Sequence, residues 1–236
     1  MDQVLQKQPN LSGNALKYIA ITAMFFDHFF AVFVVHESMA GSLLRITGRV
    51  VAPIMCYLIA EGFNYTSDIK KYTKRLLLFA LISHFPYVWY FNLPWWKATS
   101  VMWGLVLGLL ALTFVKKTKH SVPIKMLAVF ICCILAYNAD WNFISVLWIL
   151  FFGLYKNNFE KQILSFTMIG IFFYIIPTLI RSGVMHSYEF GIFLSIPILS
   201  MYNGKPGKKQ RYLKWGFYIF YPLHLLILYL LRLTIL

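Results

Sequence analysis

The sequence predicts an all-α polytopic membrane protein, with a single transmembrane domain over residues 1–236 and about nine spans. Three observations predict this fold. The chain is 60% hydrophobic and only 13% charged, whereas soluble domains average about 45–50% apolar and about 25% charged residues. Its apolar residues gather in runs that approach the length of a bilayer crossing. Short polar segments rich in lysine and arginine separate these runs.

The individual spans are placed by their apolar runs and by the segments that interrupt them. The first follows a polar stretch, MDQVLQKQPNLSGNA, which lacks the pattern of a cleaved signal peptide, so we expect the apolar run after it to remain as a helix. Polar or basic loops at 65–75, 116–125, 156–161 and 203–214 follow alternate spans, and a DWN turn at 140–142 separates the fifth from the sixth. The fifth, sixth and eighth spans are short, which leaves a range of roughly eight to ten. In order, the predicted spans are 16–35, 44–64, 71–92, 99–115, 124–138, 141–155, 162–181, 188–202 and 213–234.

Lysine and arginine mark one side of this arrangement. All but five of the 22 Lys and Arg residues fall at the N-terminus or in alternate loops, the exceptions being Arg45, Arg49, Lys97, Arg181 and Arg232. Because basic loops stay on the cytoplasmic side, the pattern predicts a cytoplasmic N-terminus in a bacterial cell membrane. An odd number of spans then places the C-terminus outside. The same asymmetry explains the net charge of +14, so we expect the lipid bilayer as a partner and no nucleic acid.

Ionisable residues inside the apolar segments are the candidate functional residues. Asp27 and His28 are adjacent in the first span, within IAITAMFFDHFFAVFVV. By helical rise, Asp27 and His84 lie roughly 12 Å, and Arg49 roughly 8 Å, below the outer ends of their spans. His224 lies near the middle of the last span. Such residues are rare in a bilayer and usually functional, so we expect polar groups from four spans to converge at one depth.

Each of these residues also has a structural interpretation. An ion pair between Asp27 and Arg49 would join two helices and would leave His28 beside His84 or His224. Each of the last two histidines, taken alone, is more typical of a buried hydrogen-bonding group. Adjacent residues on one helix point about 100° apart, so a direct contact between Asp27 and His28 is not required.

Two further charged residues lie towards the ends of the second span. Arg45, one turn from Arg49, can extend its side chain to the membrane interface. Glu61 lies near the inner end, where it can cap the helix or pair with the basic cluster at 70–75.

Metal and cofactor motifs are not found in the sequence. It contains no phosphate-binding loop, zinc-protease motif or hydrolase elbow. Cys56, Cys132 and Cys133 lie in apolar segments without metal-ligand spacing, so we expect buried free thiols. The span histidines have no carboxylate or thiol spaced with them for zinc, so we expect no metal.

Four segments, in order, resemble the TraX family. They are DH in the first span, GRVVAPIMCYLIAEGF (48–63), IKKYTKRLLLFALISHFPY (69–87) and WGFYIFYPLHLLIL (215–228). Members of this family are multi-spanning inner-membrane proteins associated with conjugation, and the name-giving member is linked to N-terminal acetylation of pilin. The family is also similar to the wider membrane acyltransferases, in which a histidine in an early span activates the acceptor.

This resemblance implies an acetyltransferase with acetyl-CoA as donor and an envelope peptide, pilin or glycan as acceptor, without a metal or prosthetic group. His28 would be the general base, Asp27 would orient it, and Arg49 or a second histidine would stabilise the oxyanion. The donor would enter from the basic face, where cations can hold its phosphates. The expected catalytic residues are Asp27, His28, Arg49, His84 and His224, and the expected substrate contacts are Arg45 and Glu61.

Two other classes of protein would also use such residues. A proton-coupled transporter needs ionisable groups in its spans, although it commonly shows internal repeats, which this sequence lacks. A non-enzymatic accessory factor for pilus or peptide export would use the polar set only to pack helices. Only the acyltransferase would consume a CoA thioester, so this measurement distinguishes it from a transporter and from an accessory factor.

Overall fold

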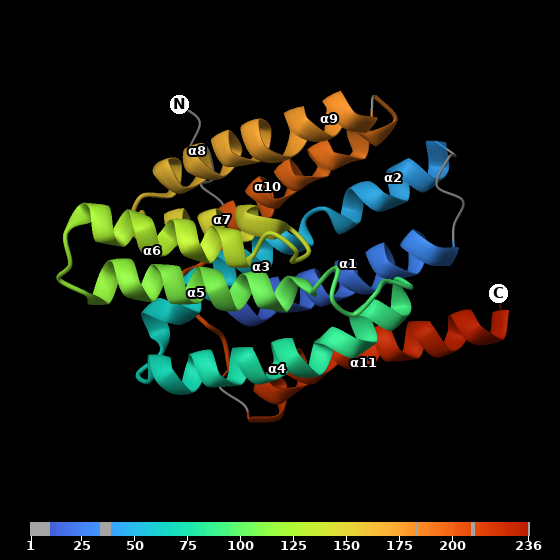
Figure 1. Cartoon of the computed structure of the whole chain (residues 1–236), viewed down its shortest axis with the longest axis horizontal. Coiled ribbons are helices and arrows are strands. Elements are labelled where there is room, and N and C mark those ends of the chain that lie inside the picture. The colour runs from blue at the N-terminus through green and yellow to red at the C-terminus, as the bar shows by residue number, and fades with distance from the viewer. Residues whose placement is uncertain (1–9, 34–38, 183, 209–210, 236) are drawn as a thin grey trace, which may run out of the picture.

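The computed structural model describes residues 10–33, 39–182, 184–208 and 211–235, which form an all-helical bundle (Figure 1). The α-helices are α1 (Gly13–Phe33), α2 (Met39–Gly48), α3 (Val51–Tyr65), α4 (Ile69–Tyr90), α5 (Val101–Lys117), α6 (Val122–Leu135), α7 (Asn142–Leu154), α8 (Phe159–Gly170), α9 (Ile176–Ser182), α10 (Ser195–Ser200) and α11 (Arg211–Ile235). A π-helical turn, η1 (Ile171–Ile175), joins α8 to α9, and a 3₁₀ stretch, η2 (Val184–Leu194), precedes α10.

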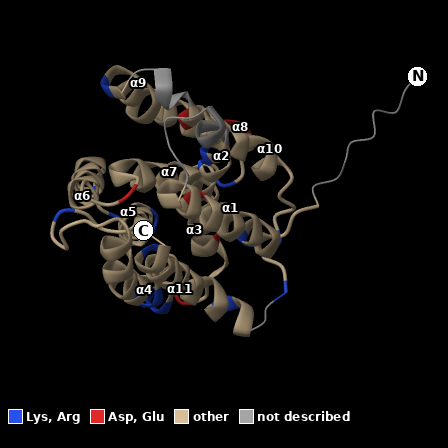
Figure 2. Ribbon diagram, turned by 90° about the vertical axis from the view of Figure 1, so that its right-hand side faces the viewer, with Lys and Arg blue, Asp and Glu red and all other residues tan. Residues whose placement is uncertain are grey.

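Four helical stretches in the described residues are long and apolar enough to cross a membrane: Gly13–Phe33, Leu44–Tyr65, Phe159–Ser182 and Tyr212–Ile235. Many large apolar side chains on the outside of the bundle are exposed, as Leu81, Phe130 and Leu164 show. Figure 2 views the helices nearly end-on, and most of their length is uncharged. The chain is therefore an integral membrane protein of several helices, as predicted.

Each predicted span coincides with a helix or with a broken helical stretch. The predicted second span contains the junction of α2 with α3, where Arg49 and Val50 form a turn. The seventh contains the π-helical turn, and the eighth is 3₁₀ helix followed by α10. Residues 34 and 35, at the end of the predicted first span, lie outside the described residues. Whether all nine stretches cross the bilayer stays a prediction.

The helices alternate in direction, which brings the predicted basic loops to one end. The turns from α3 to α4, from α5 to α6 and from α7 to α8 all lie at the left-hand end in Figure 1. At this end Asp68 caps α4 by accepting a hydrogen bond from the backbone N–H of Lys71, at 2.9 Å. The same bond holds the pKa of the Asp68 carboxyl below its usual value.

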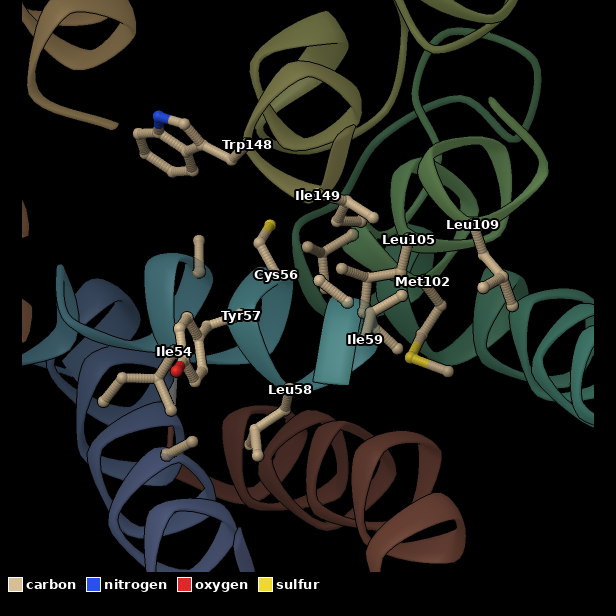
Figure 3. Close-up of a cluster of buried hydrophobic side chains, with 14 of the residues drawn as sticks. Ile54, Cys56, Tyr57, Leu58, Ile59, Met102, Leu105, Leu109, Trp148 and Ile149 are labelled. Carbon is tan, nitrogen blue, oxygen red and sulfur yellow. The ribbon is translucent and has the colours of Figure 1, made fainter. Parts of the chain in front are cut away.

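The interior of the bundle is built by α3, α5 and α7 (Figure 3). Ile54 and Cys56 of α3, Leu105 of α5 and Trp148 of α7 are fully buried there. This apolar block holds α3 in place, and α3 begins at Val51, two residues after Arg49. The core therefore fixes one wall of the polar region described next.

Candidate functional site

His28 pairs with His224, and the pair joins the first helix to the last. His28 Nδ1 lies 2.7 Å from His224 Nε2, and the two rings are stacked with 5.0 Å between centroids. Both residues are buried. The hydroxyl of Tyr90 on α4 donates a hydrogen bond to the backbone carbonyl of His28, which ties α1 to α4 at the same point. Three helices therefore position the His28 ring.

The hydrogen bonds determine which nitrogen of each ring carries its proton when both are neutral. His224 Nδ1 donates a hydrogen bond to the backbone carbonyl of Phe220, one turn earlier in α11, at 2.8 Å. A neutral His224 then has its lone pair on Nε2, which accepts a hydrogen bond from His28 Nδ1. His28 consequently keeps its own lone pair on Nε2, as a general base requires.

Asp27 belongs to a separate ion cluster, which joins α1 to the α2–α3 junction and to η2. Arg49 Nη2 donates to both carboxylate oxygens of Asp27, at 3.0 and 3.2 Å. Its Nη1 lies 3.4 Å from Glu189 Oε2, and Arg45 Nε lies 3.9 Å from Asp27. Two arginines therefore face two carboxylates, and the predicted ion pair of Asp27 with Arg49 is present.

Aromatic side chains complete the ion cluster. Tyr174, in the π-helical turn, donates to Glu189 and accepts from Arg49 Nη1, at 3.3 Å. The guanidinium of Arg49 lies 5.7 Å from the ring centroid of Trp141 and 5.6 Å from that of Tyr188. The guanidinium of Arg49 is thus contacted on several sides and connects the helices that carry these residues.

The close approach of the helices at this cluster depends on glycine. A Cβ atom at Gly48 would lie 2.3 Å from the carboxyl group of Asp27. A Cβ atom at Gly191 would lie 2.5 Å from the backbone oxygen of Ile46 and 3.0 Å from the Cβ of Arg49. Because real Cβ contacts are never so short, a side chain at either position would force the ion pairs apart.

Two cavities meet beside the histidine pair. The larger, of about 300 Å³, extends from Lys17, Arg75 and Lys214 into the bundle. The smaller, of about 30 Å³, is lined by Asp27, His28 and Asp140. Four residues line both cavities and form the junction between them: Met24, Met55, Val101 and Tyr221.

The other two predicted site residues lie away from the histidine pair. His84 is half-buried on α4 between the exposed side chains of Ile82 and Phe85, and its ring contacts Phe85. Glu61 is buried near the basic end of α3, where it accepts a hydrogen bond from the hydroxyl of Tyr202, while that of Tyr65 donates to the backbone carbonyl of Gly204. The structure therefore brings together Asp27, Arg45 and Arg49 in one cluster and His28 with His224 in another.

Sequence reasoning missed three members of this region. Glu189 and Tyr174 complete the ion cluster, and Tyr221 lies at the junction of the cavities. Glu189 was detectable as an acidic residue within a predicted span, whereas a tyrosine in an aromatic-rich sequence gives no such signal.

In the described ranges, no group of three or more His, Cys, Asp or Glu side chains is arranged to hold a metal ion. The cysteines are free thiols: Cys56 is buried, and Cys132 and Cys133 are half-buried.

Comparisons with known proteins place these residues in a wider context. A sequence model described as TraX protein matches residues 12–232. The chain is also 29% identical to the probable fimbrial assembly protein FimC, serogroup H1, of Dichelobacter nodosus, over 95% of this chain and 97% of that protein. No solved structure matches. The family match covers both polar clusters, from Asp27 to His224.

Proposed function

The chain belongs to the TraX family, and we propose that it is a membrane acyltransferase that moves an acetyl group from acetyl-CoA to an acceptor in the cell envelope. The similarity to a protein named for fimbrial assembly supports a peptide N-terminus, such as that of a pilin, as the acceptor. An acetylated glycan is the alternative acceptor. We place the protein in the bacterial cytoplasmic membrane with its basic loops inside, since most lysines and arginines fall in those loops.

The observation that carries this proposal is a cavity that extends from three basic residues to four side chains that also line the His28 pocket. A donor entering at Lys17, Arg75 and Lys214 passes between apolar walls and arrives at the junction with the smaller cavity. His28 lines that smaller cavity. In this proposal the thioester of the donor reaches the junction residues, next to the pocket that His28 lines.

In the proposed reaction His28 acts as general base. The acceptor amine attacks the carbonyl carbon of the thioester, and Nε2 of His28 removes a proton from the nitrogen. The tetrahedral intermediate then collapses, the bond from carbon to sulfur breaks, and the thiolate of CoA takes the proton back from the imidazolium. The products are an amide, or an ester for a sugar hydroxyl, and free CoA.

Stabilisation of the oxyanion is assigned to Tyr221. Arg49 lines neither cavity, and its Nη1 and Nη2 are engaged by Asp27, Glu189 and Tyr174. Tyr221 is buried at the junction of the two cavities, and its ring lies 6.4 Å from that of His28. A phenolic O–H there would donate to the carbonyl oxygen as it gains charge. His224 would orient His28 and stabilise its protonated form.

A substitution of His28 tests the proposal. His28→Ala is expected to lower acetyl transfer by about 10²–10⁴-fold, the usual contribution of a general base. Transfer of labelled acetyl groups from acetyl-CoA to envelope proteins and glycans would be measured in membranes that contain equal amounts of protein. His120→Ala, in the exposed turn after α5, is the matched histidine control.

Full acetyl transfer by the His28→Ala protein would refute the proposal. So would solute flux in vesicles that depends on His28 but consumes no CoA thioester, because that result identifies a transporter.

A further inference from the structure

The mouth of the larger cavity carries three cations, one from each of three helices. Lys17 comes from α1, Arg75 from α4 and Lys214 from α11. All three lie within about two turns of the start of their helices, so they gather near one end of the bundle.

The described residues that line this cavity include no aspartate or glutamate. The ammonium of Lys17 lies 5.2 Å from the ring centroid of Phe217, and Arg75 Nε is buried without a hydrogen-bond partner in the described part of the chain. Arg75 also contacts the hydroxyl of Tyr218. A buried guanidinium N–H without an acceptor points to a ligand that supplies one.

Beyond the mouth the cavity is apolar. Leu58, Ile59 and Leu76 line its walls. Its volume of about 300 Å³ is at the lower end of the range of small-molecule sites. The inner end is formed by the junction residues, which include Met24 and Met55. A ligand that fits this shape has a strongly anionic head and a narrow, unbranched arm.

We propose that this cavity binds a phosphate ester through Lys17, Arg75 and Lys214, with the arm of the ligand extended towards the junction. The assignment of the ligand as the acyl-CoA donor rests on the function proposed above. Phosphates of CoA meet the three cations, Arg75 binds two phosphate oxygens through its planar fork, and the pantetheine arm lies between α1, α3 and α4. This arrangement brings the thioester to His28 from the basic end of the bundle.

Binding of CoA to the purified full-length protein tests this site separately from catalysis. The protein would be placed in nanodiscs of neutral phosphatidylcholine, and CoA affinity would be measured by calorimetry. Arg75→Gln is expected to weaken CoA binding about tenfold, and the triple variant Lys17→Gln/Arg75→Gln/Lys214→Gln at least about 100-fold. Pantetheine, which lacks the phosphates, is expected to bind all these proteins equally weakly.

Lys74→Gln is the matched control. Lys74 is exposed, lies next to Arg75 and does not line the cavity, so its substitution removes the same charge while leaving CoA affinity within about twofold. An unchanged melting temperature in the triple variant establishes that the bundle is folded. Equal CoA affinity in the wild-type and triple-variant proteins would overturn the proposal, as would an equal loss in Lys74→Gln.

A lipid headgroup offers the same phosphate chemistry, and a second membrane composition separates the two sources. CoA affinity that persists in phosphatidylglycerol nanodiscs supports the soluble donor. The opposite result overturns the donor assignment in favour of a lipid. In that case the wild-type protein loses CoA binding in phosphatidylglycerol nanodiscs, and it binds phosphatidylglycerol whereas the triple variant does not.

The two proposals fail in different ways. CoA binding that depends on the three cations, without acetyl transfer, refutes the enzymatic function and supports the binding site. Acetyl transfer by the triple variant with an unchanged KM for acetyl-CoA refutes the binding site and supports the function.

Discussion

Asp27 and His28 are neighbours in the chain, yet their side chains belong to different assemblies. Asp27 binds Arg49 at 3.0 Å, and Arg49 connects it to Glu189, whereas His28 binds His224 at 2.7 Å. Successive residues of an α-helix point about 100° apart, so α1 presents each residue to a different neighbour. Asp27 and His28 therefore do not form one dyad, although they are adjacent in α1.

The two assemblies also differ in what they can do. The ion cluster pairs two arginines with two carboxylates, so its members are suited to holding α1, the α2–α3 junction and η2 together. In the histidine pair, by contrast, His224 donates to the carbonyl of Phe220 and accepts from His28 Nδ1. When both rings are neutral, this leaves a lone pair on His28 Nε2. We therefore expect the first assembly to contribute stability and the second to carry the proposed chemistry.

Arg49→Ala should have the largest effect on stability. The substitution leaves the carboxylates of Asp27 and Glu189 inside the bundle without their central cation, which typically costs about 3–5 kcal/mol. The free energy of unfolding would be measured by denaturant titration in detergent. The variant is also expected to accumulate poorly in membranes.

A neutral replacement of the cluster provides the control for Arg49→Ala. The quadruple variant Asp27→Asn/Arg45→Gln/Arg49→Met/Glu189→Gln removes all four charges together and should recover most of the lost stability. If Arg49→Ala unfolds like the wild type while losing acetyl transfer, Arg49 acts in the chemistry and the division between the two assemblies is wrong.

The ion cluster also shows how far sequence reasoning reaches. Asp27 and Arg49 were predictable partners because both interrupt apolar spans at similar depth, and the family resemblance drawn from four segments is confirmed. Glu189 joins them only because a π-helical turn and a 3₁₀ stretch bring Tyr174 and Glu189 to Arg49. Hydropathy indicates that a helix is present but not where its backbone departs from the α-helical repeat.

The bundle itself was more predictable than its sites. Apolar runs and basic loops located every helical stretch, because the bilayer requires internally bonded helices of limited length. The break before α3 was not predicted. The cavities were not predictable either, since their walls combine side chains from α1, α3, α4 and α11 whose rotation about each helix axis depends on packing. The cytoplasmic N-terminus and the single domain stay predictions.

Gly48→Ala should have an intermediate effect on stability. Its new Cβ would meet the carboxyl group of Asp27 at 2.3 Å, so the α2–α3 junction must move away from α1, at a cost of about 1–3 kcal/mol. Thermal unfolding in detergent would measure the loss. Gly216→Ala is the matched control: nothing lies within 4 Å of a Cβ there, so that variant should be as stable as the wild type or slightly more stable. An equal loss in both variants would mean that helix propensity, rather than the approach of Asp27, determines the result.

His84→Ala should have the smallest effect, although the sequence groups His84 with His28 and His224. Its ring contacts Phe85 on α4 rather than the histidine pair, and exposed side chains flank it. We expect acetyl transfer within about threefold of the wild type and a change in stability within about 0.5 kcal/mol, as is usual for a side chain outside a buried network. The assay is the one used for His28→Ala, so the two variants are compared directly. If His84→Ala lost as much acetyl transfer as His28→Ala, then a histidine at this depth in the membrane would take part in the reaction without contacting His224.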